Sequence, residues 1–317
     1  MPVLFFLHGL GDNITRIDNE FHFSQVADEF GWAIVVPQAR NEGYGTMWNA
    51  GLMSSSTDDS GFLMALLDSL ATQYPFDMDS VFFTGFSMGG FMTHRMAIEY
   101  GDRITACAPV SGLITFSMAA QSAVPVRMLH IHGTSDQVVG YDGGSQYFGS
   151  TLGLSVDAIL NYWKDANATV DDPVIDTFPD LHNDGLRFVR YSYKGDKELQ
   201  HIKVIGGTHT WYHSESQYDI GYLIEIYKFF TGKDGNIDGT SEIVQKTLSV
   251  WPNPTSGPTI IEAETTMMVE VLDYQGRVVA KRQLEHGTNS IDLGLLPNGL
   301  YFLKGENGAL EKVLLMK

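Results

Sequence analysis

The chain has 317 residues, a formal net charge of −18, 44% hydrophobic residues and 18% charged residues. This length allows one large domain and a small one, and no apolar run reaches the roughly 20 residues that cross a bilayer. We therefore expect no transmembrane segment. Because so negative a field repels phosphate backbones, we also expect no nucleic-acid partner.

Short apolar runs alternate with helix-length amphipathic segments over the first 230 residues. Alternation of this kind predicts an α/β domain, in which a mostly parallel sheet carries helices on both faces. The predicted strands are 3–7, 33–36, 81–84, 105–110, 127–132, 187–191 and 202–205. The predicted helices are 61–74, 88–100, 155–165 and 218–230.

A different pattern follows this region. Residues 232–246 are polar and turn-rich, which is typical of a linker, and from residue 247 short alternating segments are separated by Gly, Pro and Asn. The segments 268–274, 277–284, 290–293, 300–304 and 311–316 predict a small antiparallel β-sandwich. We therefore expect a catalytic domain over 1–231, a linker over 232–246 and a β-sandwich over 247–317.

The linker contains a sequence similar to the start of a calcium-binding loop, Asp234-Gly-Asn-Ile-Asp-Gly239. Its twelfth position is Gln245, which lacks the bidentate carboxylate, and a strand rather than a helix is predicted to follow. Cys107 is the single cysteine, so a site of several thiolates is excluded. We expect no metal and no cofactor.

The sequence Gly85-Phe-Ser-Met-Gly89 matches the Gly-x-Ser-x-Gly elbow. The apolar strand 81–84 enters it and the helix 88–100 leaves it, as this motif requires. Small residues let backbone segments approach, and the sharp turn presents the serine hydroxyl beside a helix N-terminus. This context predicts Ser87 as the nucleophile of an α/β-hydrolase.

The acid of such an enzyme follows the nucleophile in the chain, and the base follows the acid. Asp136 lies in Gly133-Thr-Ser-Asp136, directly after the strand 127–132, where open α/β sheets gather their active groups. Asp136 is the predicted acid. The alternatives are a purely turn-forming role for Asp136, or Asp142 as the acid.

Among the later histidines, His209 lies just beyond the strand 202–205 on a Gly-Gly loop that leads toward a helix. It is the predicted base, which takes the proton of Ser87 while the acid orients its imidazole. His213 shares the loop and is the main alternative; His182 and His201 fit surface or strand positions better.

An oxyanion hole requires two main-chain donors. One is the N–H of Met88, the residue after the nucleophile. The other should come from the glycine-containing loop after the first strand, with Leu10 preferred and Gly11 second. His8 fits a buried structural histidine better than a chemical role.

In six short pieces, the first 230 residues resemble the esterases grouped around polyhydroxybutyrate depolymerases and feruloyl or acetylxylan esterases. The resemblance implies a secreted α/β-hydrolase with Ser87, Asp136 and His209 as its triad. It also implies that Trp48 and Trp211 lie near the cleft and bind substrate, the alternative being that both are core or rim residues. The matching pieces are Leu7-His-Gly9, Trp48-Asn49, Asp59-Ser-Gly-Phe62, Gly85-Phe-Ser-Met-Gly-Gly90, His132-Gly-Thr-Ser-Asp136 and Gly206-Gly-Thr-His-Thr-Trp211.

The two ends of the chain add to this interpretation. The first strand begins at residue 3 and leaves no room for a signal peptide, so the chain looks shortened relative to the family. The tail resembles the C-terminal sorting domain of the type IX secretion system, through Trp251-Pro-Asn-Pro254, Gly276-Arg277 and Gly299-Leu-Tyr301. The resemblance implies contact with the secretion machinery and a secreted or cell-surface location; the alternative is a carbohydrate-binding or packing sandwich.

The leading hypothesis is therefore a secreted serine esterase, a carboxylic ester hydrolase that acts on feruloyl or acetyl esters of plant polysaccharide. A polyhydroxyalkanoate depolymerase would use the same triad on a polyester. A non-enzymatic alternative is a carbohydrate-binding or adhesion protein on a degenerate hydrolase scaffold.

Overall fold

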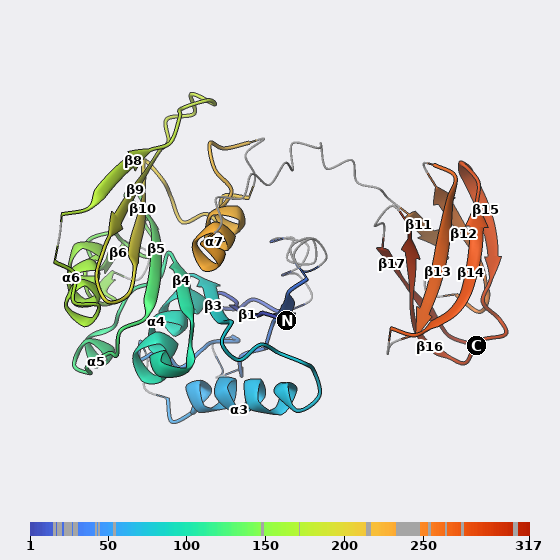
Figure 1. Ribbon diagram of the computed structural model, residues 1–317, viewed down its shortest axis with the longest axis horizontal. Helices are drawn as coiled ribbons and strands as arrows, with labels where there is room; N and C mark the ends of the chain where they lie inside the picture. The colour runs from blue at the N-terminus through green and yellow to red at the C-terminus, as the bar shows by residue number, and fades with distance from the viewer. Residues whose placement is uncertain are drawn as a thin grey trace. The chain divides into compact units, whose positions relative to one another are not determined.

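A computed structural model of the chain divides into two compact units, Met1–Gly235 and Asn236–Lys317 (Figure 1). The structure describes residues 1–14, 17, 21, 27, 31–41, 43, 45–52, 55–146, 149–170, 172–213, 217–232, 248–252, 255–263, 265–273, 276–306 and 310–317. The predicted linker, except residue 232, and the calcium-like sequence Asp234–Gly239 therefore lie outside the described residues.

An eight-stranded sheet forms the centre of the first unit, in the order β2-β1-β3-β4-β5-β10-β9-β8. The first six of these strands pair in parallel, while β9 and β8 continue the sheet in antiparallel fashion. Their bounds are β1 Val3–Leu7, β2 Ala33–Val35, β3 Val81–Phe86, β4 Ala106–Val110, β5 Arg127–Gly133, β8 Val174–Thr177, β9 Arg187–Tyr193 and β10 Leu199–Ile205.

Helices cover both faces of this sheet, as the alternating pattern predicted. Phe5 faces the cluster that contains residues of α3, α4 and α6, whereas Phe82 stacks on Phe230 of α7 at 4.7 Å on the opposite face. Since successive strand side chains point to opposite faces, runs that are apolar throughout are buried on both sides. The helices are α3 Asp59–Ala71, α4 Met88–Tyr100, α5 Phe116–Ala119, α6 Val156–Ala166 and α7 Tyr222–Thr231, with a 3₁₀ turn at Gly101–Arg103.

The second unit contains two antiparallel sheets, β11-β12-β15 and β14-β13-β16-β17. Apolar residues from both sheets share one buried core, among them Ile261 and Val271. The strands are β11 Leu248–Trp251, β12 Pro258–Ala263, β13 Met267–Asp273, β14 Val278–Leu284, β15 Gly287–Asp292, β16 Gly299–Gly305 and β17 Leu310–Leu315. The predicted fold class, an α/β-hydrolase-type sheet followed by antiparallel β-sheets, is confirmed.

The sequence analysis missed several short elements. β8 lies at the sheet edge with all four residues exposed, so it lacks the apolar signal of a buried strand. β12 was also missed, as were α5 and the small hairpin of β6, Gly144–Ser145, with β7, Ser150–Thr151. In the described part of the chain, no helix combines the length and apolarity needed to span a bilayer.

Candidate active site

Ser87 occupies a strained turn between β3 and α4. Its φ is 57° and its ψ is −121°, a combination that a residue with a side chain rarely adopts. Its N–H donates to Val110 O on β4 at 3.0 Å, which ties the turn to the sheet. The hydroxyl-bearing residue is thus held at the carboxyl end of β3 and at the start of a thirteen-residue helix.

The glycines of the elbow are required by close approach of the backbone. A Cβ built on Gly89 would lie 1.8 Å from Leu7 O, and one on Gly85 would lie 2.5 Å from Gly89 O. No side chain fits at either position, because the contacting atoms belong to the main chain. The start of α4 is therefore pressed against the end of β1.

The loops that follow β5 and β10 are bonded directly to each other. Ser135 N–H donates to Gly207 O at 2.9 Å, and Gly206 N–H donates to Thr134 Oγ1 at 3.0 Å. These contacts bring Asp136 and His209 together, with His209 Nδ1 2.7 Å from Asp136 Oδ2. Two residues that are 73 positions apart thereby form one hydrogen-bonded pair.

The surroundings of Asp136 determine which nitrogen of His209 carries the proton. The carboxylate is fully buried, and its Oδ1 accepts from the N–H groups of Val138 and Val139 at 2.9 and 2.8 Å. Since an ionised carboxylate only accepts, the proton lies on His209 Nδ1. Nε2 is then left with a lone pair, as a general base requires.

The imidazole of His209 lies beside the elbow. Its ring is 4.8 Å from the ring of Phe86, the residue that precedes Ser87. The side chain of His209 is 16% exposed, whereas that of Asp136 is buried, so solvent reaches the pair from the side of His209. The structure therefore gathers Ser87, Asp136 and His209 at the carboxyl ends of β3, β5 and β10.

The loop after β1 also reaches the elbow. A Cβ built on Gly9 would lie 3.7 Å from Ser87 Cβ. Gly11 N–H donates to Thr46 O at 2.8 Å, whereas no described residue accepts from Leu10 N–H. Of the two candidates in this loop, Leu10 therefore keeps its amide available, and Met88 N–H, in the first turn of α4, has no acceptor within the helix.

His8 supports this loop from below. It is fully buried, Nδ1 donates to Gly9 O at 2.7 Å, and Nε2 accepts from Ala39 N–H at 3.0 Å. Burial lowers the pKa of His8, so the ring is neutral and fits these two bonds. Trp48 Nε1 donates to His8 O at 3.1 Å, which adds a second brace.

The expected substrate-binding role of the two tryptophans does not fit the structure. Trp48 is 1% exposed and Trp211 is 4% exposed, so neither offers a flat surface to a ligand. Trp211 packs edge-on against Phe6, Phe21 and Phe86, with ring centroids 5.0 to 6.2 Å apart. Both indoles back the loops of the site from inside the core, which was the alternative reading of these residues.

The remaining alternatives also have defined places. The ring of His213 lies 6.0 Å from that of Phe21, and Asp142 is exposed with Oδ1 accepting from Gly144 N–H at 3.0 Å. His182 is exposed, and His201 is buried within β10. The imidazole that forms a hydrogen bond with Asp136 is that of His209.

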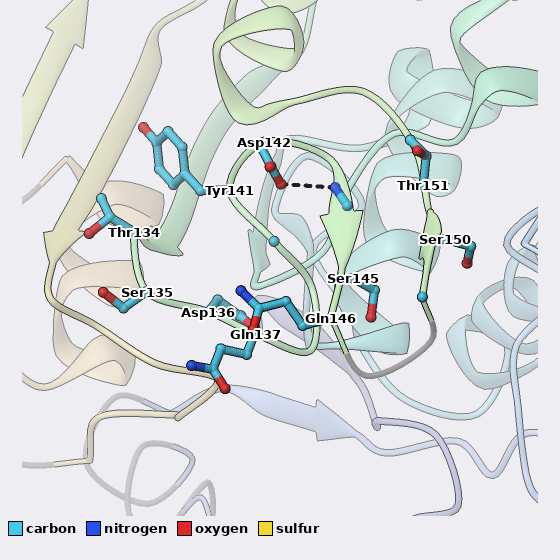
Figure 2. A pocket seen from close by; sticks show the side chains of 13 residues that line it. Thr134, Ser135, Asp136, Gln137, Tyr141, Asp142, Ser145, Gln146, Ser150 and Thr151 are labelled. Carbon is cyan, nitrogen blue, oxygen red and sulfur yellow. Dashed lines mark hydrogen bonds between the residues drawn. The ribbon is translucent and has the colours of Figure 1, made fainter.

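A pocket of about 720 Å³ opens next to Asp136 (Figure 2). Its walls are the loop after β5 and the β6–β7 hairpin, and Figure 2 shows mainly hydroxyl and amide side chains around it. Ser87 and His209 do not line it, so it flanks the acid rather than the nucleophile. Its lining residues are Thr134, Ser135, Asp136, Gln137, Gly140, Tyr141, Asp142, Gly144, Ser145, Gln146, Gly149, Ser150 and Thr151.

Sequence reasoning missed a group of buried histidines behind Asp136. His94, His130, His132 and His201 have exposed fractions of 0 to 1%. Burial lowers the pKa of each, to about 3 for His94 and His201. The signal in the sequence was His130-Ile-His132, two histidines on one face of an otherwise apolar strand.

Two family models match parts of this chain. Residues 1–149 match the family described as Phospholipase/Carboxylesterase, and residues 249–315 match the Secretion system C-terminal sorting domain. The chain is 31% identical over 140 residues to a bifunctional acetylxylan esterase/xylanase of Neocallimastix patriciarum; the matched region covers 44% of this chain and 20% of that protein. It is 32% identical over 96 residues to a probable feruloyl esterase C of Aspergillus niger, covering 30% of this chain and 35% of that one.

These relatives confirm the predicted resemblance to acetylxylan and feruloyl esterases. The chain spans well under half of the length of each relative. Among solved structures, an acetyl xylan esterase from Aspergillus awamori superposes with a TM-score of 0.54 at 15% identity. That match covers 73% of this chain and 89% of the other, and at this identity it supports the fold.

Proposed function

We propose that this chain, whose residues 1–149 match the phospholipase/carboxylesterase family and whose residues 249–315 match a secretion sorting domain, is a secreted serine esterase. The observation that carries the proposal is the bond between His209 Nδ1 and Asp136 Oδ2, which leaves Nε2 basic beside a strained serine. The sorting domain indicates a secreted or cell-surface protein, and its proposed partner is the type IX secretion machinery.

The proposed chemistry follows from these positions. Ser87 Oγ attacks the ester carbonyl while His209 Nε2 takes its proton, and Asp136 stabilises the imidazolium that forms. The N–H groups of Leu10 and Met88 stabilise the oxyanion. His209 then gives the proton to the departing alcohol, which leaves Ser87 acylated. Water, deprotonated by the same imidazole, releases the acid and restores the serine.

A fluorophosphonate probe tests the enzymatic part of the proposal. We expect one equivalent to attach to Ser87, located by mass spectrometry of the tryptic peptide, because only an activated serine reacts rapidly. We expect the same protein to hydrolyse p-nitrophenyl acetate. A folded chain that neither labels nor hydrolyses would instead favour the binding or adhesion alternative.

The pocket beside Asp136 supports a sugar ester rather than a polyester as substrate. Apart from the Tyr141 ring and glycines, its lining is polar, and none of the described residues forms a hydrogen bond with the side chains of Gln137 or Gln146. A hydroxyl-rich ligand can satisfy such amides, whereas an alkyl chain would leave them desolvated and unpaired. We therefore propose that this pocket receives a sugar of an acetylated or feruloylated polysaccharide. Polyhydroxyalkanoate remains the second candidate.

Substitution of the pocket's two glutamines tests whether it binds a sugar. We expect the double variant Gln137→Ala, Gln146→Ala to raise KM for acetylated xylo-oligosaccharides about thirtyfold, since two hydrogen bonds of about 1 kcal/mol each are lost. Its kcat/KM for p-nitrophenyl acetate, which carries no sugar, should stay unchanged. Parallel assays of ferulate release and of clearing of a polyester suspension separate the two substrate classes; a variant with unaltered KM for the sugar ester would contradict the assignment.

A further inference from the structure

A row of side chains joined by hydrogen bonds runs through the core behind the proposed acid. Trp163 Nε1 lies 3.2 Å from His94 Nδ1, and His94 Nε2 lies 3.2 Å from His130 Nδ1. His130 Nε2 lies 3.3 Å from His132 Nδ1, and His132 Nε2 lies 2.7 Å from Val139 O. All four ring side chains, from α6, α4 and β5, are completely buried.

The two ends of this row fix every proton along it. An indole nitrogen can only donate, so His94 Nδ1 must accept and its proton lies on Nε2. A neutral imidazole has one donor and one acceptor. His94 Nε2–H therefore donates to His130 Nδ1, and His130 Nε2–H donates to His132 Nδ1. At the far end, Val139 O can only accept, and His132 Nε2–H donates to it. Each ring is therefore the Nε2–H tautomer and each ring nitrogen has a partner.

The far end of the row is attached to the turn that carries Asp136. Val139 receives the bond from His132 at its carbonyl and gives its own N–H to Asp136 Oδ1 at 2.8 Å. His132 Nε2 also lies 3.7 Å from Asp136 Oδ2, the oxygen that pairs with His209. The buried carboxylate thus lies between His209 and a donor that faces it from the interior.

We propose that His132, oriented through His130 and His94 by Trp163, is a positioning residue that holds Asp136 for its bond with His209. With the opposite tautomer, the lone pair of His132 Nε2 would face Val139 O and Asp136 Oδ2, two oxygens that can only accept. That arrangement would push the turn away and rotate the carboxylate. The inference rests on the proposed function, because positioning matters for turnover only if Asp136 orients a catalytic base.

Two substitutions at His132 test the donor itself. His132→Phe keeps a planar aromatic ring, although a larger one, and removes both the donor to Val139 O and the acceptor for His130 Nε2–H. We expect kcat for p-nitrophenyl acetate to fall about 100-fold with KM little changed. His132→Gln, whose amide can reach the same carbonyl, should recover most of that loss. The proton shared by His209 Nδ1 and Asp136 gives a low-field NMR signal, which we expect to broaden or vanish in His132→Phe and to return in His132→Gln.

The remote end offers a test that leaves the site untouched. Trp163→Phe removes one of the two end groups that fix the tautomers, so that Val139 O alone holds them, and we expect a smaller loss of kcat, about tenfold, with a partial loss of the low-field signal. His201→Phe is the matched control. His201 is equally buried and its ring is 5.6 Å from that of His130, but its nitrogens bond His130 O and the Tyr141 hydroxyl. This variant should lose stability without losing kcat or the signal.

The outcomes separate the two proposals. Thermal melting first establishes that each variant is folded at the assay temperature. Unchanged kcat and an unchanged low-field signal in folded His132→Phe and Trp163→Phe would overturn the positioning role. Equal loss of kcat in His201→Phe would also overturn it, since the effect would then follow core damage in general. A wild-type chain without esterase activity would refute the proposed function, while the low-field signal would still report whether His132 holds the Asp136–His209 pair.

Discussion

Replacement of Ser87 by alanine is expected to lower kcat/KM for p-nitrophenyl acetate by about 10⁴- to 10⁶-fold. Alanine removes the only side-chain oxygen of residues 85–89, so no acyl-enzyme can form, while the oxyanion donors and the bound substrate geometry remain. The small side chain leaves the packing of Gly85 and Gly89 intact, and the melting temperature should change little. Stopped assays with purified protein, extended over hours, measure this range.

The matched control for this variant is Ser69→Ala, which removes the hydroxyl of an exposed serine on α3, remote from the elbow. It should retain full activity and full labelling by the fluorophosphonate probe. Ser87→Ala with more than about a tenth of wild-type turnover would show that another group is the nucleophile.

Acid is expected to destabilise the first unit strongly at a pH where most globular proteins are still stable. His94, His130, His132 and His201 have lowered pKa values in the folded state, whereas in the unfolded chain each takes up a proton near pH 6.5. The unfolded state thus binds more protons, so stability is present above pH 6.5 and is lost as pH falls toward 3. His94 and His201, whose pKa values fall to about 3, together lower the free energy of unfolding by about 2.7 kcal/mol per pH unit once the unfolded chain is fully protonated, and His130 and His132 act in the same direction.

Urea unfolding followed by tryptophan fluorescence between pH 7.5 and 5 measures this slope. His201→Phe removes one of the buried sites and should reduce the slope by about 1.4 kcal/mol per pH unit, whereas His182→Gln, at an exposed histidine, should leave the slope unchanged. Equal stability of the wild-type chain at pH 7.5 and pH 5 would contradict the expectation. His94 and His201 alone account for a loss of about 4 kcal/mol by pH 5, a large part of the 5 to 15 kcal/mol by which a domain is commonly stable.

Local signals predicted the elements of the first unit well. α4 begins at Met88 and ends at Tyr100, as the spacing of its apolar residues predicted, and β1 has the bounds expected from an unbroken apolar run. The sequence of such a segment predicts its own secondary structure, because the period and length of the apolar pattern distinguish a helix from a strand. β8 carries no such signal, since an exposed edge strand needs no apolar face.

The site was predicted in outline rather than in detail. The order of residues along the chain was enough to expect that Asp136 and His209 would meet, and they do so at 2.7 Å; their catalytic roles stay a proposal. The burial of Trp48 and Trp211 could not be read from their own neighbourhood, because it depends on which distant side chains pack against each indole. The same holds for the bonds between His94 and His130, which join α4 to β5.

The loop after β1 and the start of α4 contribute main-chain amides to the proposed oxyanion hole, and this has an evolutionary consequence. The side chain of Leu10 is 42% exposed and no part of the proposed chemistry uses it. Substitutions at position 10 can therefore change the shape of the rim of the site, while the main-chain N–H of that residue stays in place. Relatives should be free to diversify there in substrate preference without first having to rebuild a catalyst.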